Sequence, residues 1–423
     1  MKKTWLVLAF GLAGCASAPE KFIYDNWQYC IQNNTKDEGT LIGLPYSYTC
    51  PSVPNDVGIF QEMYYWDTYF TNVGLILSDR IDQAKNNCRN MAYLINRYGF
   101  MPNGNRTFYL NRSQPPFLSR MVRDIYTATG EKEWIAEMYP VLVKEHKFWT
   151  TKRVTTSGLN RYFGDFATNE ERIEFGRDFL KRMKMPMETN LVALANYGDC
   201  YIAHAESGWD CTSRFGYRAQ DFDWVDLNAL LYGLEADLEF FAQELKNGEE
   251  GRWEAVAEAR KDRMNRVLWD DKLGMFADHD FVHDQKSAFV SIAQFYPLFT
   301  KVATKAQAEK TVKLLPKLEQ RYGVACSQKE GLLDMQWDYP HGWACLHYVM
   351  INALENYGYH EDALRIARKY IGVVDKIFDE TGCLWEKYNV VKGEISVTRE
   401  YDSPKMLGWS AGVYLFCRRF CEM

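Results

Sequence analysis

The chain has 423 residues, is 47% hydrophobic and carries a formal net charge of −6 at pH 7. This length and apolar content allow a large buried core. The acidic balance, without a long run of lysine or arginine, argues against a nucleic-acid partner. Aromatic residues make up 15% of the chain. Core packing is the ordinary explanation for any single tryptophan, but many of these aromatics stand in polar, loop-like stretches, where a ring face can stack on a sugar.

The first fifteen residues, MKKTWLVLAFGLAGC, have the pattern of an export signal. Two lysines precede an apolar run that is too short to span a bilayer. The ending Leu12-Ala-Gly-Cys resembles a bacterial lipoprotein box, in which Cys15 becomes the lipidated first residue; a plain signal peptide cut near Ala16 or Ala18 is the alternative. We therefore expect removal of residues 1–14 and a periplasmic or cell-surface protein whose only membrane attachment is an N-terminal lipid anchor.

The ten later cysteines show no paired framework and no C-x-x-C motif, so mostly buried free thiols are expected. Residues 15–50 are mixed in character and are expected to form a lead-in segment. Residues 51–423 are expected to form one domain, because apolar residues recur there at spacings of three and four, the helical period. The expected helices span residues 63–78, 81–97, 116–128, 132–150, 170–184, 189–204, 226–246, 250–268, 285–298, 304–318, 342–357, 361–378 and 408–420.

The links between these helices alternate between short and long. Each short link returns the chain antiparallel to the preceding helix. The long links, at residues 98–115, 151–169, 205–225, 269–284, 319–341 and 379–407, then all fall at one end. This connectivity predicts an all-α fold, an (α/α)6 barrel of six helical hairpins with a concave loop face. An α-solenoid is the alternative, but no fixed sequence period supports it.

Six of the thirteen tryptophans are followed directly by an acidic residue, whereas this composition predicts fewer than two by chance. Two of these pairs fall in or at the end of expected helices and are interpreted as structural. The other four lie in or beside the long links: Trp66-Asp67, Trp209-Asp210, Trp337-Asp338 and Trp385-Glu386. An aromatic wall desolvates a carboxyl and raises its pKa. Cleavage of a glycosidic bond needs one such protonated acid and a second, ionised carboxylate.

Two stretches, Gln61-Glu-Met-Tyr-Tyr-Trp-Asp-Thr-Tyr-Phe and Gln336-Trp-Asp-Tyr-Pro-His-Gly-Trp, resemble the signature stretches of the trehalases, glycoside hydrolase family 37. Further motifs match the family in the same order, over about residues 54 to 415: Pro102-Asn-Gly-Asn-Arg, Asn111-Arg-Ser-Gln-Pro-Pro, Ser207-Gly-Trp-Asp-Cys-Thr-Ser-Arg, Trp385-Glu-Lys-Tyr-Asn, Glu400-Tyr and Gly408-Trp-Ser-Ala-Gly. The resemblance implies an (α/α)6 barrel, in agreement with the alternation of links.

The resemblance also implies residue roles. Asp210 resembles the general acid, and Glu386 resembles the general base that activates water. Sugar contacts are implied for Trp66, Asp67, Asn103, Arg112, Ser113, Gln114, Gly208 and Glu400. The family inverts the anomeric carbon, which requires the two carboxyls to stand about 6.5–9.5 Å apart. A small saccharide is the only expected partner, a monomer is expected, and no cofactor is needed. His279 and His283 lack a third ligand in a recognised spacing, so no metal is expected.

Two positions depart from the family pattern. Ile59 stands where the family has a substrate-binding arginine. In the 163–177 loop an Arg-Pro-Glu stretch is missing, so that Arg172 is at best a shifted substitute. Trehalose is therefore the first expected substrate and another small α-glucoside is the alternative. A saccharide-binding protein without catalysis is a further alternative, as is a lyase or epimerase, whose chemistry would rest on histidine or tyrosine bases.

Overall fold

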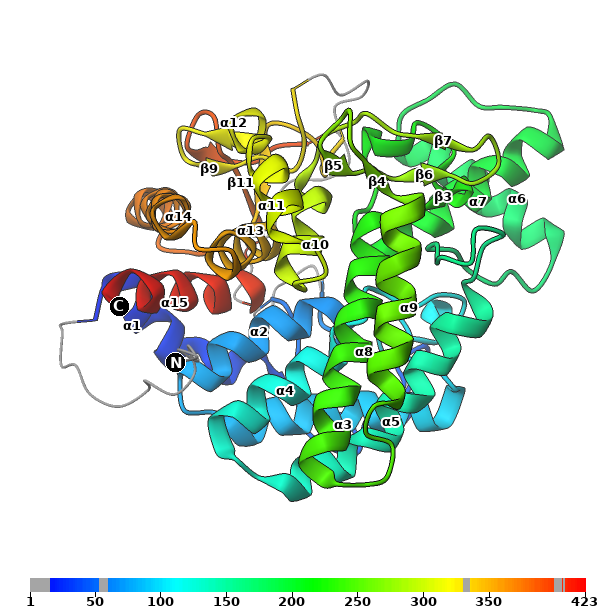
Figure 1. The fold of residues 1–423 in the computed structure, drawn as a ribbon. Coiled ribbons are helices and arrows are strands. Elements are labelled where there is room, and N and C mark those ends of the chain that lie inside the picture. The colour runs from blue at the N-terminus through cyan, green and yellow to red at the C-terminus, as the bar shows by residue number, and fades with distance from the viewer. Residues whose placement is uncertain (1–15, 53–59, 330–334, 399–404, 406–407) are drawn as a thin grey trace.

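The computed structural model describes residues 16–52, 60–329, 335–398, 405 and 408–423. Within this part of the chain, an inner ring of helices surrounds the core, and each helix of the ring packs against the next (Figure 1). The ring consists of α2 (Tyr65–Leu77), α4 (Leu118–Thr129), α8 (Val225–Leu245), α10 (Tyr296–Phe299), α13 (Ala344–Asn356) and α15 (Gly408–Glu422). Because α15 packs against α2, the ring closes and the fold is a barrel, not an open solenoid.

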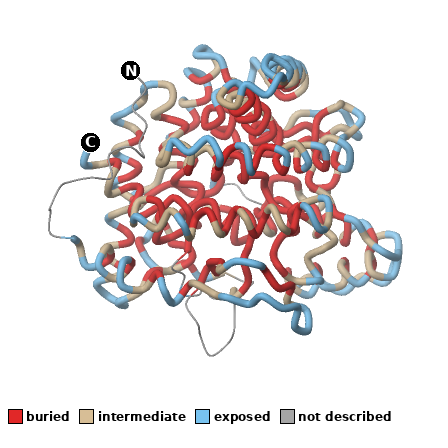
Figure 2. Tube along the Cα trace, turned by 90° about the horizontal axis from the view of Figure 1, so that it is seen from below, coloured by how far each residue is buried: buried red, intermediate tan, exposed pale blue. Residues whose placement is uncertain are grey.

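A second layer lies behind this ring. Helices α3 (Ile81–Tyr98), α5 (Lys132–Lys152), α9 (Arg252–Val267) and α14 (His360–Thr381) each pack on the inner helix that precedes them. Each connection is short, which is why neighbours run antiparallel. Figure 2 shows the buried residues gathered in the interior and the exposed ones on the outer turns. The all-α (α/α)6 barrel predicted from the alternation of links is confirmed.

The remaining elements decorate the barrel. Helix α1 (Ala18–Asn26) opens the described chain, α6 (Asn169–Arg182) and α7 (Leu191–Ser207) form a hairpin, and α11 (Lys305–Val312) and α12 (Leu315–Leu318) are short. Short 3-10 helices are η2 (Trp27–Cys30), η3 (Thr107–Tyr109), η4 (Ser213–Phe215), η5 (Ala219–Asp221) and η6 (Ile292–Phe295).

Small antiparallel sheets lie in the loops, and most of them stand at one end of the barrel (Figure 1). One has the order β3 (Phe222–Asp223), β6 (His279–Asp280), β7 (Gln285–Lys286), and another has the order β10 (His341–Trp343), β11 (Lys387–Asn389), β12 (Glu394–Ile395). Two-stranded ladders pair β1 (Ile31–Gln32) with β2 (Tyr48–Thr49), β4 (Trp269–Asp270) with β5 (Met275–Phe276), and β8 (Glu319–Gln320) with β9 (Gly323–Val324).

Two expected helices differ from the structure. Residues 285–298 do not form one helix, because Asp284 adopts a left-handed conformation (φ 50°) that turns β7 back onto β6. Helical structure starts there only after Ser291, whose side chain caps η6. The expected helix 304–318 is split into α11 and α12, and Pro316 stands in the first turn of α12, where its missing N–H is tolerated.

The lead-in segment contains a helix that the sequence analysis missed. Ser17 and Glu20 form a capping box at the start of α1, a signal that is visible in the sequence. The next turn buries Trp27 completely, and its Nε1 donates to Ser78 Oγ at 2.9 Å. The lead-in therefore packs directly on the end of α2.

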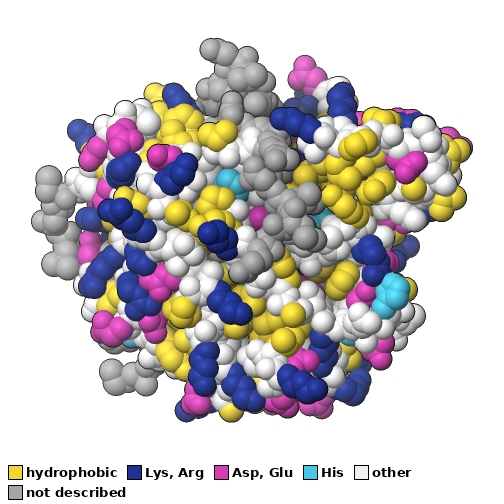
Figure 3. Space-filling view, turned by 90° about the horizontal axis from the view of Figure 1, so that it is seen from above, with side chains coloured by type: hydrophobic (Ala, Val, Ile, Leu, Met, Phe, Trp, Pro, Cys, Tyr) yellow, Lys and Arg dark blue, Asp and Glu magenta, His cyan; other side chains and the backbone are white. Residues whose placement is uncertain are grey.

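The hairpin α6–α7 stands apart from the inner ring. Its two helices pack mainly on each other, and α7 also contacts η5. The last helix, α15, takes the closing place in the ring. No disulfide links the described cysteines, and most of them are buried, as expected. No helix in the described ranges has both the length and the apolar character needed to cross a membrane. On the face in Figure 3, acidic and basic side chains are interspersed.

Closure of the ring depends on close backbone contact between α2 and α15. A Cβ on Gly412 would stand 1.9 Å from the carbonyl oxygen of Phe70, and one on Gly74 would stand 2.6 Å from the Cα of Gly412. No side chain fits at this crossing, so both positions require glycine.

Gly412→Ala is therefore expected to lower the free energy of unfolding by about 2–3 kcal/mol or more, because the helices must separate. Gly372 is the matched control: it lies on exposed α14, and a Cβ there meets nothing within 4 Å. Gly372→Ala should be neutral or stabilising by up to about 1 kcal/mol, since alanine favours helix. Urea unfolding measures both values. Equal effects would show that the α2–α15 crossing is not the constraint.

Candidate active site

Asp210 follows the end of α7 by three residues. The helix stops at Gly208, which caps it in the left-handed conformation (φ 71°). A Cβ at Gly208 would stand 2.6 Å from the Trp66 indole, so the close approach also requires glycine. Trp209 is fully buried and its N–H donates to Ser207 Oγ at 3.0 Å. The tight turn thus directs consecutive side chains differently: Trp209 packs into the core, whereas the Asp210 side chain is 36% exposed.

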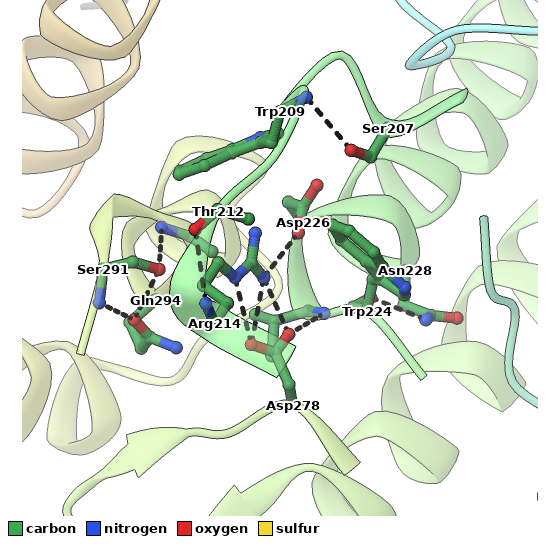
Figure 4. Close-up of polar contacts among 12 residues, drawn as sticks. Ser207, Trp209, Thr212, Arg214, Trp224, Asp226, Asn228, Asp278, Ser291 and Gln294 are labelled. Carbon is green, nitrogen blue, oxygen red and sulfur yellow. Dashed lines mark hydrogen bonds and ion pairs between the residues drawn. The ribbon is translucent and has the colours of Figure 1, made fainter. Parts of the chain in front are cut away.

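A buried arginine lies beneath this turn (Figure 4). The guanidinium of Arg214 is fully buried and bonds Asp226 at 2.9 Å and Asp278 at 2.8 Å. It also lies over the indoles of Trp209, at 4.8 Å, and Trp224, at 5.0 Å. The two carboxylates come from distant parts of the chain, so this ion cluster ties the turn to α8 and to the strand region before β6.

Asp338 holds the same turn from another side. Its carboxylate accepts hydrogen bonds from Thr212 Oγ1 and from the Ser213 N–H, both at 3.0 Å. Between these anchors and Asp210 lies Cys211, which has a positive φ of 55°. A non-glycine residue keeps this sparsely populated conformation only where its surroundings impose it. Asp338, one of the four loop-face acids of the sequence analysis, is thus a buried anchor.

Glu386 immediately precedes β11, which pairs with β10 in the register Trp343↔Lys387. The carboxylate is 3% exposed and lies 2.5 Å from the ammonium of Lys387, which is fully buried. The Glu386 carbonyl accepts from Trp409 Nε1 at 3.3 Å. The strand pairing therefore carries Glu386 to the loop end of the barrel, beside the second signature stretch.

A cluster of tryptophans forms the floor beside these carboxyls. Trp337 stacks on Trp343 with ring centroids 3.9 Å apart, and it also contacts Trp66 at 5.5 Å and Trp209 at 5.6 Å. Trp409 meets Trp343 edge-on at 5.5 Å. Of the four loop-face tryptophans in the sequence analysis, three join this cluster. Trp385 does not, because its indole turns away and donates to Thr381 Oγ1.

Asp67, in the first turn of α2, lies near enough to Asp210 and Glu386 for their charges to affect its pKa. The residue is 8% exposed, and burial raises the pKa of Asp67 to about 8. The neighbouring charges of Glu386 and Asp210 contribute to this raised pKa, but less than burial does. Charges act in this way only over short distances in a buried setting. The structure therefore brings together acids that are separated by more than 300 residues between the first and the last in sequence.

Asp210 itself combines desolvation with a cationic neighbour. Burial by the surrounding protein raises the pKa of Asp210, although part of its carboxyl remains open to solvent. The charges of Arg182 and Arg112 lower it, but less. Arg182 Nη2 lies 3.5 Å from Asp210 Oδ2, and its Nη1 donates to the Tyr201 hydroxyl at 2.9 Å.

The structure differs from the sequence-based expectation that Arg172 replaces the arginine missing from the 163–177 loop. Arg172 is paired with Asp199 on α7 through two hydrogen bonds, so it is not available as a shifted substitute at the site. The arginine that reaches the candidate acid is Arg182, the last residue of α6. No local motif marks it, because only the packing of α6 on α7 brings it to Asp210.

The other expected sugar contacts fall into two groups. Arg112 lies over the Tyr109 ring at 4.9 Å, and its buried Nε has no hydrogen-bond partner among the described residues. Asn103, Ser113 and Gln114 are buried and bond the backbone: Asn103 Nδ2 donates to Ala205 O, Ser113 Oγ donates to Met101 O, and Gln114 Oε1 accepts from Trp66 N.

Asn103, Ser113 and Gln114 thus connect the loop around Arg112 to α7 and to α2. Glu206 completes this connection, because its carboxylate accepts from the Ser113 N–H at 2.8 Å and pairs with buried Arg153 at 2.8 Å. The expected positions Glu400, Ile59 and Cys15 lie outside the described residues.

The two histidines considered as metal ligands are engaged otherwise. His279 lies between Asp223 and Asp284 at 2.9 and 3.0 Å, and His283 bonds Asp280 at 3.0 Å. Among the residues that the structure describes, no group of three or more histidine, cysteine or acidic side chains is arranged to hold a metal ion.

Comparison with known proteins agrees with this geometry. The trehalase family model matches residues 32–421. A periplasmic trehalase from Salmonella newport is 34% identical over 409 residues, which cover 90% of this chain and 69% of the relative. A putative periplasmic trehalase from Salmonella typhi shows the same identity and coverage.

Solved structures share the fold of this chain. The neutral trehalase Nth1 from Saccharomyces cerevisiae superposes with a TM-score of 0.76 at 26% identity, over 97% of this chain and 80% of that one. A mannosylglycerate hydrolase from Thermus thermophilus shares the fold with a TM-score of 0.65 at 16% identity, over 94% and 99% of the two chains.

A closed helical barrel with clustered carboxyls at its loop end, together with these relatives, defines the protein as a glycoside hydrolase. The chain belongs to the trehalase family.

Proposed function

We propose that this protein hydrolyses trehalose to glucose with inversion, using Asp210 as the general acid and Glu386 as the general base. The observation that carries this proposal is the shared environment of the carboxyls, in which the charges of both residues reach Asp67. The choice of trehalose as the substrate is supported by the relatives that are named trehalases.

The two residues suit opposite roles. Burial raises the pKa of Asp210, which favours the protonated form that a leaving oxygen requires. Glu386 forms an ion pair with Lys387, whose ammonium lies 2.5 Å from its carboxylate. In an inverting reaction the acid protonates the bridging oxygen while the base takes a proton from water, which attacks the opposite face of the sugar. The proposal requires a carboxyl separation of about 6.5–9.5 Å.

We further propose that Arg112 and Arg182 bind the sugar hydroxyls on the acid side, since guanidinium groups donate in a planar fork. The buried carboxyl of Asp67 also hydrogen-bonds a sugar hydroxyl, as acceptor or as donor. Another small α-glucoside is the alternative substrate, because the set of arginines differs from the family pattern at positions 59 and 172.

We also propose that the protein is a periplasmic or cell-surface lipoprotein anchored through Cys15. The sequence pattern at residues 1–15 and the relatives named periplasmic trehalases support export. Expression of the full chain in a bacterial host with the Cys15→Ala variant tests the anchor. The wild type should fractionate with membranes and carry lipid by mass spectrometry, and the variant should be released; identical fractionation without lipid contradicts the anchor.

Asp210→Asn and Glu386→Gln should each lower kcat on trehalose by about 10²–10⁴-fold or more, because each removes one partner of the acid–base pair. The effects on stability should differ. Asp210 is partly exposed and its ion pair is long, so its variant should unfold close to the wild type. Glu386→Gln leaves buried Lys387 without its neighbouring charge and should lose about 1–3 kcal/mol.

A coupled glucose assay and thermal unfolding measure these outcomes. Glu394→Gln, at an exposed acid on neighbouring β12, is the matched control and should retain full activity. Binding of trehalose by the wild type without turnover would favour a saccharide-binding protein, and substantial activity in either catalytic variant would refute the assigned roles.

Arg182→Met should shift the alkaline limb of the kcat/KM profile to higher pH. The Arg182 charge lowers the pKa of Asp210, so its removal raises this pKa, and the acid stays protonated at higher pH. Arg172→Met, on the same helix but paired with Asp199, should leave this limb in place. A limb that moves to lower pH, or that moves equally in both variants, would contradict the coupling between Arg182 and Asp210.

A further inference from the structure

A pocket lies beside α7, and neither the candidate acid nor the candidate base lines it. It has a volume of about 510 Å³, and its lining includes Arg161, Phe163, Asn196, Tyr197, Tyr217 and Asp221. None of Asp67, Asp210, Glu386 or Arg112 lines it. A volume of this size falls in the range of small-molecule sites. Its lining residues come from α7, from the loop after α5 and from residues 217–221, which precede β3.

An aromatic wall separates this pocket from the candidate active site. Phe179 on α6 contacts the pocket residues Tyr197 and Tyr217, with ring centroids 6.0 and 6.1 Å away. The same ring contacts Tyr201 at 5.6 Å, and Tyr201 lies beside Arg182 and Asp210 on the other side. The two sites therefore back onto one wall but are lined by different residues.

Arg161 has donor groups that its protein neighbours do not use fully. Its Nη1 donates to the Gln220 carbonyl at 2.8 Å, and the guanidinium lies over the rings of Phe163 at 4.4 Å and Phe281 at 5.5 Å. No carboxylate forms an ion pair with Arg161 within the described ranges. Since a guanidinium carries five N–H donors, several remain for a ligand in the pocket.

The remaining polar groups are balanced in charge. Arg218 pairs with Asp221 and Asp280, both at 2.8 Å, and Asp199 pairs with Arg172. The pocket lining thus contains two arginines and two aspartates, with Asn196 and Gln220 as neutral amides. A pocket built for an anion would have an excess of cations. A mixture of donors and acceptors suits hydroxyl groups, each of which donates and accepts.

The aromatic side chains complete the pattern. Tyr197 and Tyr217 meet edge-on at 5.8 Å, and the Phe163 ring, also in the lining, lies under the guanidinium of Arg161. Ring faces next to planar polar groups match a ligand that has both C–H faces and a rim of hydroxyls. Among small molecules, a neutral sugar has this composition.

We propose that this pocket is an accessory binding site for a neutral saccharide of one or two rings, separate from the site of hydrolysis. Arg161 and Asn196 bind its hydroxyls, and Tyr217 packs against a ring face. The pocket retains saccharide on the protein surface beside the active site. The proposal does not require Asp210 or Glu386 to have any particular role.

The test uses the full mature chain carrying Asp210→Asn, so that the probe is not hydrolysed, with trehalose and maltose as probes. Ligand-observed NMR titration and crystals soaked in either sugar are expected to reveal two occupied sites per chain. Adding Arg161→Met should weaken the second site by about tenfold or more, the effect of losing one charged hydrogen bond. The Arg252→Met control, at an exposed arginine of α9, should change neither site.

Asn196→Ala is the second variant, because its exposed side chain can be removed without disturbing the core. It should weaken the accessory site and, in the otherwise wild-type chain, leave kcat on trehalose within about twofold, since Asn196 is remote from the reacting atoms. Circular dichroism confirms folding of each variant.

Two results would overturn the proposal: a single bound sugar whose affinity is unchanged by Arg161→Met and Asn196→Ala, or a pocket that binds inorganic phosphate but no neutral sugar. Failure of the hydrolytic function is distinguishable, because it would abolish turnover in the wild type while sugar binding sensitive to Arg161 persisted.

Discussion

The buried ion cluster of Arg214 with Asp226 and Asp278 is the interaction on which the site depends. A fully buried arginine is tolerated only when its charge is paired, and breaking such a pair costs about 3–5 kcal/mol. The cluster therefore holds the turn after α7 in a single position relative to α8 and the β3–β6 sheet. Together with Asp338 it also maintains the positive φ of Cys211, next to the candidate acid. Rigid support of this kind is what a preorganised catalytic carboxyl needs.

The position of the candidate base, Glu386, depends on the pairing of two strands. Pairing of β10 with β11 brings Glu386 next to the second signature stretch, and Trp343, which stacks on Trp337, packs against the ammonium of neighbouring Lys387. The acid and the base thus rest on independent supports that meet over one tryptophan cluster. Trp66 and Trp209, which precede Asp67 and Asp210 in the sequence, both belong to this cluster, and burial raises the pKa of Asp67 to about 8.

Much of this architecture could be predicted from the sequence, because helical periodicity and link length are local signals. The barrel followed from the alternation of short and long links, and the carboxyls were marked by their tryptophan neighbours. Features set by tertiary packing could not be predicted. Arg182 reaches Asp210 only because α6 folds onto α7. Trp385 carries the same local pattern as Trp209 but turns away from the cluster. Residues 285–298 have helical spacing, yet a left-handed Asp284 and pairing with β6 override it. The role of Asp338 as an anchor is likewise visible only from its contacts with Thr212 and Ser213.

The most direct test of the central claim is the anomeric form of the glucose released first from trehalose, followed by proton NMR before mutarotation. If Asp210 and Glu386 act across a gap that holds a water molecule, attack inverts one anomeric carbon, and each turnover releases one β-glucose together with one α-glucose. Release of α-glucose alone would show retention through a covalent intermediate and would contradict this account of the site.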